Sequence, residues 1–245
     1  VIKQNKGAEV RLFMPKYGCV NERRHQLHEV IRLSGVNIVV NDIDQPLIVK
    51  VASIPQARLQ VYFIDNEEYF QKKVILNEKN ESLVKDNDER MMFFCRGVLE
   101  TLQMLGWSPN IIHCHGWFTS LLPLYLKASS DENQKIYFNH PVFKETKIIS
   151  SFYSKGFTGS LDKNLVAKLA FDGFNDEILS QLKNPNWESL NQIAAQFSDG
   201  VIFGENSNQD KLLKLAYKNN TPVLSSDDYT AYYDFYQNFF SEELV

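Results

Sequence analysis

The chain has 245 residues, of which 26 are basic and 30 acidic, and its formal net charge is -4. No long basic run is present, and no apolar run approaches the roughly 20 residues needed to cross a bilayer, so the composition excludes a typical nucleic-acid binder and a membrane-spanning protein. The three cysteines, Cys19, Cys95 and Cys114, are few, odd in number and widely spaced, which predicts a reducing, cytoplasmic location rather than a disulfide framework.

The N-terminal third predicts several β-strands. Gly7 ends a first helical pattern, and a strand is expected from Glu9 to Pro15. Residues 30–54 contain short segments rich in Val and Ile that are separated by turn residues, and Leu59 to Ile64 reads as a main strand of the sheet. The first strand of such folds is usually central, so we expect the natural protein to have an upstream segment that contains it.

The middle of the chain alternates between helix and strand patterns. Asp88 is expected to cap a helix that ends near Gly106. A strand from Asn110 to Cys114, a helix from Trp117 to Lys127 and a second strand in residues 144–153 follow. This is the pattern of a βαβ unit with parallel strands.

The C-terminal part continues the alternation, with helices expected in residues 161–174, 186–200, 208–220 and 227–244 and a short strand in 201–206. The whole pattern predicts an α/β fold, namely a Rossmann-like, doubly wound, mostly parallel sheet with helices on both faces, in a single domain covering residues 1–245. An aromatic stripe recurs at helical spacing near the end of the chain. We expect it to lie in the core or against a partner; its members are Tyr229, Tyr232, Tyr233, Phe235, Tyr236, Phe239 and Phe240.

The stretch "NIIHCHGWFTS" carries the main candidate site. His115, Gly116 and Trp117 follow a predicted parallel strand and open a helix, and ligands of open α/β sheets bind beyond the carboxyl ends of strands. Gly116 permits a sharp turn or a close ligand, Trp117 offers a face for a sugar or base, and His115 is the candidate catalytic residue. The alternative is that His113 is a satisfied core histidine and that Trp117 and Gly116 serve only packing and the turn.

Four further residues end or follow predicted strands, and these are Tyr17, Asp65, Asn66 and Tyr153. Strand ends on one edge converge around the topological switch point, so we expect them to share the substrate-binding edge with His115, Gly116 and Trp117. Carboxylate, amide and imidazole groups suit sugar hydroxyls, and aromatic faces suit a pyranose ring. Strand ends also need turn residues, which is the competing interpretation.

Metal and cofactor sites are weakly indicated. His113 and His115 share a strand face and His25 and His28 a helix face, which would suit zinc, but no acidic residue lies between either pair. Phosphate-binding glycine motifs and the Gly-x-Ser-x-Gly nucleophile motif are absent from the sequence, and "KGFTGS" at 155–160 is the nearest approach to a phosphate loop. We therefore expect no metal and no redox cofactor.

Several blocks resemble the N-terminal domain of bacterial glycogen synthases and plant starch synthases. The blocks occur in that family's order, and they read "RLFMPKYG", "VYFIDNEEYF", "DNDERMMFFCRGVLETL", "GWSPNIIHCHGWFTSLLPLYLK" and "FSDGVIFGEN". The resemblance implies a retaining glucosyltransferase of the two-domain GT-B type. Such enzymes transfer glucose from ADP-glucose, here the expected donor, to an α-1,4-glucan in the cleft between the domains.

The sequence also departs from that family. Phe118 replaces the active-site histidine of the family's Asp-Trp-His-Thr motif, and Tyr153 and Ser154 replace a His-Asn pair. The family's Lys-x-Gly-Gly loop would lie before Val1, and the second domain has no counterpart in these 245 residues. We expect a domain that is incomplete as a catalyst alone; the alternative is a non-catalytic glucan-binding or regulatory module that docks a partner chain, and a homo-oligomer remains open.

Overall fold

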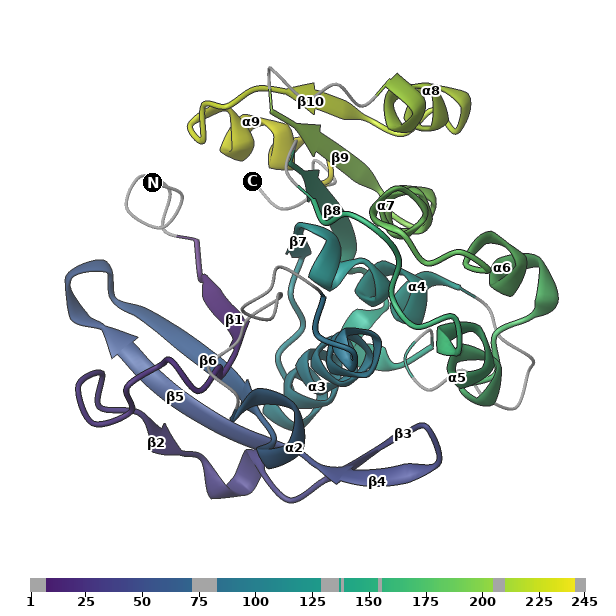
Figure 1. Ribbon diagram of the computed structural model, residues 1–245. Coiled ribbons are helices and arrows are strands. Elements are labelled where there is room, and N and C mark those ends of the chain that lie inside the picture. The colour runs from purple at the N-terminus through teal and green to yellow at the C-terminus, as the bar shows by residue number, and fades with distance from the viewer. Residues whose placement is uncertain are drawn as a thin grey trace. The chain divides into compact units, whose positions relative to one another are not determined.

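The computed structural model describes residues 8–71, 83–128, 137, 139–153, 156–204 and 210–240. Two compact units are present, formed by Ile2–Trp107 and Ser108–Val245. Figure 1 shows the helices and strands of both units.

The first unit contains a mixed sheet with strand order β1-β6-β5-β2. The strands are β1 (Arg11–Pro15), β2 (His28–Glu29), β5 (Ile48–Ile54) and β6 (Leu59–Asp65). β1 and β6 are parallel, whereas β5 pairs antiparallel with both β6 and β2. The segment predicted in residues 30–54 also forms a separate hairpin from β3 (Asn37–Val40) and β4 (Ile43–Pro46).

A long helix, α3 (Asn87–Leu105), packs on this unit. Gly97 permits the close approach, because a Cβ there would lie 2.8 Å from Ile64 Cγ2. The helix ends as predicted at Gly106, which has a φ of 58°. The predicted cap was wrong, since Asp86 holds the N-cap position and Asp88 is buried within the first turn.

The second unit contains a fully parallel sheet with strand order β10-β9-β8-β7. Its strands are β7 (Ile111–His115), β8 (Lys147–Phe152), β9 (Gly200–Phe203) and β10 (Val223–Ser225). Its helices are α4 (Leu121–Lys127), α5 (Leu165–Phe171), α6 (Asp176–Gln181), α7 (Trp187–Gln196), α8 (Asp210–Lys218) and α9 (Ala231–Gln237). The predicted α/β architecture with a parallel sheet is therefore confirmed, although β10 and α6 were not predicted.

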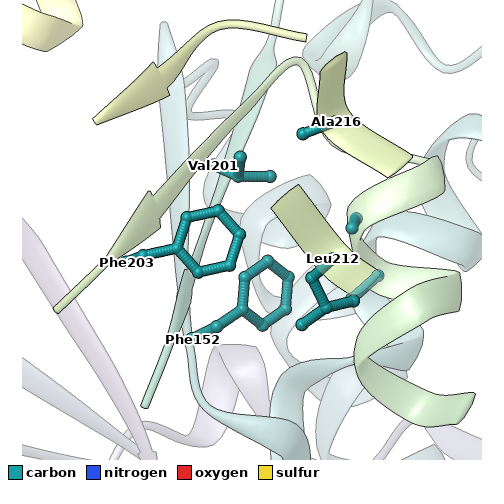
Figure 2. Packing of buried hydrophobic residues seen from close by; sticks show 7 residues of the cluster. Phe152, Val201, Phe203, Leu212 and Ala216 are labelled. Carbon is teal, nitrogen blue, oxygen red and sulfur yellow. The ribbon is translucent and has the colours of Figure 1, made fainter. Parts of the chain in front are cut away.

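One face of this parallel sheet packs against α7 and α8. Figure 2 shows Phe152 and Phe203 extending from the strands toward Leu212 of α8. The buried cluster consists of Phe152, Ala194, Ala195, Val201, Phe203, Leu212 and Ala216. Burying these side chains supplies the apolar contact that holds the two helices on the sheet.

The opposite face packs against α9. Side chains alternate between faces along a strand, and Gly200 therefore faces away from its neighbour Val201. A Cβ on Gly200 would lie 2.5 Å from the ring of Phe239 and 3.2 Å from that of Phe235. The predicted aromatic stripe is thus largely core, because Tyr232, Phe235 and Tyr236 are buried, while Tyr229 stays exposed.

The remaining short elements are α2 (Glu67–Phe70) and the 3-10 turns η1 (Ile31–Leu33), η2 (Pro55–Ala57), η3 (Trp117–Thr119) and η4 (Pro141–Phe143). Within the described ranges, no helix has both the length and the apolar character that a membrane crossing requires.

Candidate active site at the strand ends

The turn after β7 depends on Gly116. Its φ of 72° and ψ of 177° lie in a region that glycine alone adopts readily. The Gly116 N–H donates to the carbonyl of Ser151 on β8, and the Thr119 hydroxyl donates to the carbonyl of Gly116 at 2.9 Å. The strand therefore ends sharply, and η3 and α4 begin at once.

Three of the predicted site residues come together at this turn. The Tyr153 hydroxyl lies 2.7 Å from Nδ1 of His115. The two rings are nearly parallel, with an angle of 19° between them. A Cβ on Gly116 would lie 3.7 Å from the Tyr153 ring. His115 and Tyr153 are both exposed, so a ligand can reach them.

His113 lies beside this pair and is fully hydrogen-bonded. Its Nδ1 is 2.5 Å from the Tyr236 hydroxyl, and its Nε2 is 2.7 Å from Oγ of Ser151. The ring centroids of His113 and His115 are 4.0 Å apart. Both ring nitrogens of this half-buried histidine therefore have partners, which supports the interpretation of His113 as a satisfied structural histidine.

The electrostatics of this cluster favour neutral side chains. Desolvation lowers the pKa of His113 well below its usual value, and the neighbouring His115 lowers it further. Desolvation also lowers the pKa of His115. Burial raises the pKa of Tyr153 to about 12 and also raises that of Tyr236. At neutral pH both imidazoles are therefore uncharged.

Trp117 is buried rather than open to a ligand. Trp117 is 6% exposed. The centroid of its ring lies 4.7 Å from that of Phe157 and 5.4 Å from that of Phe118. Trp187 covers Gly156 so closely that a Cβ there would lie 2.1 Å from its ring. Trp117 thus supports the turn after β7 by packing, and Trp187 supports the loop after β8.

Tyr17, Asp65 and Asn66 lie in the first unit, where β1 and β6 are parallel. Tyr17 follows the carboxyl end of β1, Asp65 is the last residue of β6, and Asn66 follows it. Asn66 caps α2 by accepting hydrogen bonds from the N–H groups of Glu68 and Tyr69. Tyr17 is buried beneath the guanidinium of Arg90, 5.4 Å from the ring centroid, and burial raises its pKa to about 12.

Asp65 belongs to an ion-pair network. Its carboxylate lies 2.9 Å from Nζ of Lys50. Glu22 pairs with Lys50 at 2.8 Å and with Lys16 at 2.6 Å. Hydrogen bonds from Lys16 and Lys50 lower the pKa of Glu22. Asp65 is 1% exposed, so structural contacts already occupy this part of the predicted edge.

The described residues contain no group of three or more side chains of the His, Cys, Asp and Glu types placed to hold a metal ion. His25 and His28 lie in the first unit and His113 and His115 in the second. His28 Nδ1 lies 3.4 Å from the carbonyl of Gln26. Cys114 is buried and unlinked, as expected for a core cysteine.

A shallow hollow of about 290 Å³ lies at the other end of the parallel pair β1 and β6. Its lining includes Arg11 and Gln60, near the amino ends of these strands. Arg11 already pairs with Glu9 at 2.8 Å and stacks on Trp107 at 4.4 Å. This hollow is therefore distinct from the predicted edge.

Sequence reasoning missed Ser151 and the role of Tyr236. Ser151 stands directly opposite His115 in the register of β7 and β8, and its side chain reaches His113. The spacing of Tyr232 and Tyr236, four residues apart on one helix, was visible as part of the aromatic stripe. Their contacts with His113 needed the tertiary structure, because 123 residues separate His113 from Tyr236.

Fold and site together define a Rossmann-like α/β protein with a histidine-bearing edge at the carboxyl ends of its strands. The model of the family described as "Starch synthase catalytic domain" matches residues 3–221. The chain belongs to this family.

Curated relatives agree with the family match. A glycogen synthase from Chlorobium limicola is 39% identical over 167 residues, which are 68% of this chain and 33% of the relative. One from Chlorobium phaeobacteroides is 37% identical over 186 residues, or 76% of this chain and 36% of the relative. The chain thus spans about a third of the length of the curated relatives it matches.

A solved structure confirms the fold. The catalytic domain of starch synthase IV from Arabidopsis thaliana, bound to ADP and acarbose, superposes with a TM-score of 0.67 at 19% identity. The match covers 91% of this chain and 45% of that one. At this level of identity the similarity concerns the fold alone.

Proposed function

We propose that this chain is the N-terminal-type domain of a glucosyltransferase that transfers glucose from ADP-glucose to an α-1,4-glucan. The family match and the glycogen synthase relatives support this assignment. The starch synthase IV neighbour was solved with ADP and acarbose, which supports a nucleotide sugar and a glucan as ligands. The observation that carries the proposal is the His115-Gly116 turn at the end of β7, with Tyr153 alongside.

The proposed chemistry needs positioning and charge stabilisation at the diphosphate leaving group. His115 and Tyr153 provide hydrogen-bonding groups at the open strand ends, and the Gly116 turn lets a ligand approach the backbone. Phe118 stands where the resemblance implies a histidine. We therefore propose that turnover by residues 1–245 alone is weak and that a partner chain, a second copy or a further domain supplies the remaining groups.

We also propose that both compact units belong to one domain, since the family match in residues 3–221 spans both. Tyr17, Asp65 and Asn66 remain proposed substrate-binding residues at the strand ends of the first unit. A cytoplasmic location is proposed from the widely spaced cysteines, which are unpaired.

The test is incorporation of labelled glucose from ADP-glucose into glycogen, with nucleotide-free controls. His115→Ala should abolish whatever turnover the chain has, whereas Phe118→His should increase it by restoring the family's residue. Thr158→Ala, in the exposed loop after β8, is a matched control that should leave turnover unchanged. Turnover that survives His115→Ala would refute the site, and glucan binding with no turnover in any variant would indicate a binding module.

A further inference from the structure

We propose that the carboxyl edge of the parallel sheet in the second unit binds pyranose rings of an α-glucan, with Tyr153 and Tyr229 as exposed stacking faces and Asp227 as an acceptor for sugar hydroxyls. The identity of the sugar rests on the proposed function, whereas the location of the surface rests on the geometry of the second unit. Asp227 and Tyr229 lie beyond residue 221, where the family match ends, so that match covers neither of them.

Neighbouring parallel strands of the second unit end at this edge, in the order β10-β9-β8-β7. His115 is the last residue of β7, Tyr153 follows β8, and Gly204 follows β9. Asp227 covers Gly204, because a Cβ on this glycine would lie 2.6 Å from a carboxylate oxygen of Asp227. Since the carboxyl ends of parallel strands share one edge of a sheet, these side chains lie at the same edge.

Two tyrosines expose their side chains at this edge, Tyr153 at 42% and Tyr229 at 63%. A continuous series of ring contacts connects them. The ring centroids are 6.3 Å apart for Tyr153 and His115, 4.0 Å for His115 and His113, 5.7 Å for His113 and Tyr232, and 5.4 Å for Tyr232 and Tyr229. The two exposed rings therefore belong to one aromatic surface, and the buried Tyr232 supports Tyr229 from behind.

Hydrogen bonds fix the turn that carries Tyr229. The Asp228 carboxylate accepts from the Thr230 N–H at 2.8 Å and from the Thr230 hydroxyl at 2.6 Å. The Ser226 N–H donates to the carbonyl of Phe203, the last residue of β9, at 2.9 Å. Because the backbone of this turn is held and a tyrosine has few rotatable bonds, little conformational freedom is lost when a ligand stacks on Tyr229.

The charges around Tyr229 favour a neutral sugar over a phosphate. The two residues that precede it, Asp227 and Asp228, are acidic and exposed. A carboxylate accepts hydrogen bonds from sugar hydroxyls, but it repels the negative charge of a diphosphate. His115 and Tyr153 are uncharged at neutral pH, since desolvation lowers the pKa of the imidazole and raises that of the phenol to about 12. Aromatic faces beside polar oxygen atoms suit the apolar face and the hydroxyl rim of a pyranose ring.

The direct test is NMR of the unaltered chain with labelled tyrosines, titrated with maltoheptaose. We expect the ring signals of Tyr153 and Tyr229 to shift in a saturable way and to show contacts with sugar protons. Tyr217, which is similarly exposed on α8, is the internal control and should not respond. ADP at the same concentration should leave the Tyr229 signal unchanged. A Tyr229 signal that responds to ADP and not to maltoheptaose would overturn the inference.

Substitutions measured by calorimetric titration with maltoheptaose test the individual residues. Tyr229→Ala should weaken binding by about fivefold to tenfold, the effect of losing one stacked ring, whereas Tyr229→Phe keeps the ring and should retain most of the affinity. Asp227→Ala should weaken binding, and Asp227→Asn should restore it because an amide still accepts from a hydroxyl. Tyr217→Ala is the matched control and should bind like the parent. Equal affinities of parent and Tyr229→Ala would refute the stacking role.

Two further outcomes separate this inference from the proposed function. If maltoheptaose binds but perturbs neither Tyr153 nor Tyr229, the inference fails, and labelled-glucose turnover would still uphold the proposed function. If the expected contacts appear but no variant or parent transfers glucose, the glucan surface stands and the transferase assignment fails. Sedimentation of the parent and of Tyr229→Ala tests the other occupant: a dimer that the substitution dissociates would assign this surface to a second copy of the chain and overturn the inference.

Discussion

At the scale of the residue, Gly116 sets the geometry of the site. Its neighbourhood has room for a Cβ, since the nearest atom would be 3.7 Å away on Tyr153. The obstacle to substitution is the backbone, whose φ of 72° with an extended ψ is costly for any other residue. The turn after β7 is therefore constrained by conformation and not by crowding.

We predict that Gly116→Ala lowers the free energy of unfolding by about 1–3 kcal/mol, the cost of holding a side-chain-bearing residue in this region. Urea unfolding followed by circular dichroism measures this. His115 should lose its hydrogen bond to Tyr153 as the turn relaxes. An alanine variant that is as stable as the parent and has an unchanged NMR signal from the His115 ring would contradict the role given to this glycine.

Single residues also show that a sequence pattern does not reveal whether a polar side chain at a strand end binds a ligand or makes structural contacts. Asp65 and Asn66 have the side chains of sugar ligands, yet one pairs with Lys50 and the other caps α2. A carboxylate after a strand has the same sequence pattern in either role. Only the position of Lys50, on the neighbouring antiparallel strand, distinguishes them.

At the scale of the element, α9 depends on the smallest side chain of β9. Gly200 leaves room for the rings of Phe235 and Phe239. We predict that Gly200→Ala displaces α9 and lowers the free energy of unfolding by about 1–3 kcal/mol, the usual cost of overpacking. Hydrogen exchange of the α9 amides and urea unfolding measure the two effects.

A matched control for this substitution is Gly204→Ala. A Cβ there would lie 2.6 Å from a carboxylate oxygen of Asp227, and the exposed end of that side chain can rotate away. The control should therefore change stability and α9 exchange much less. Equal effects of the two substitutions would show that α9 does not rely on Gly200.

The contact between β7 and α9 also predicts a pH dependence. Both His113 and His115 have lowered pKa values in the folded chain, whereas an unfolded histidine titrates near about 6.5. Below that pH the two histidines bind protons in the unfolded chain but not in the folded chain. The free energy of unfolding therefore falls as the pH falls. The slope should approach about 1.4 kcal/mol per pH unit for the half-buried His113 and be smaller for His115, because solvent screens its exposed ring.

Urea unfolding at several pH values between 7 and 5 measures this slope. His113→Gln removes one of the two titrating groups, so its profile should be flatter than that of the parent. The comparison concerns slopes, because the substitution also changes stability at neutral pH. A parent profile that is flat over this range would contradict the neutral state of the two imidazoles.

At the scale of the whole molecule, the described residues offer no metal centre. We predict that dialysis against EDTA leaves the midpoint of thermal unfolding unchanged, because we expect metal binding to contribute no folding free energy. Metal analysis of protein purified without a histidine tag provides the second measurement. Stoichiometric zinc, with a lower midpoint after its removal, would contradict the prediction.

The sequence by itself determined the class of fold and predicted the place of the candidate site. Alternating strand and helix patterns predicted the parallel sheet, because hydrophobic periodicity is a local property. The "HCHGW" stretch located the turn, because a glycine between a strand pattern and a helix pattern can be recognised in the sequence alone. One of the blocks that resemble glycogen and starch synthases contains this stretch.

Only the tertiary structure decided which side chains serve the site and which serve the core. It buried Trp117 against Phe157, paired Asp65 with Lys50 and placed Tyr236 against His113. It also revealed β5 as antiparallel to β6 and added β10 to the parallel sheet. These contacts join residues far apart in the chain, and they depend on packing and register, which no local pattern of residue types encodes.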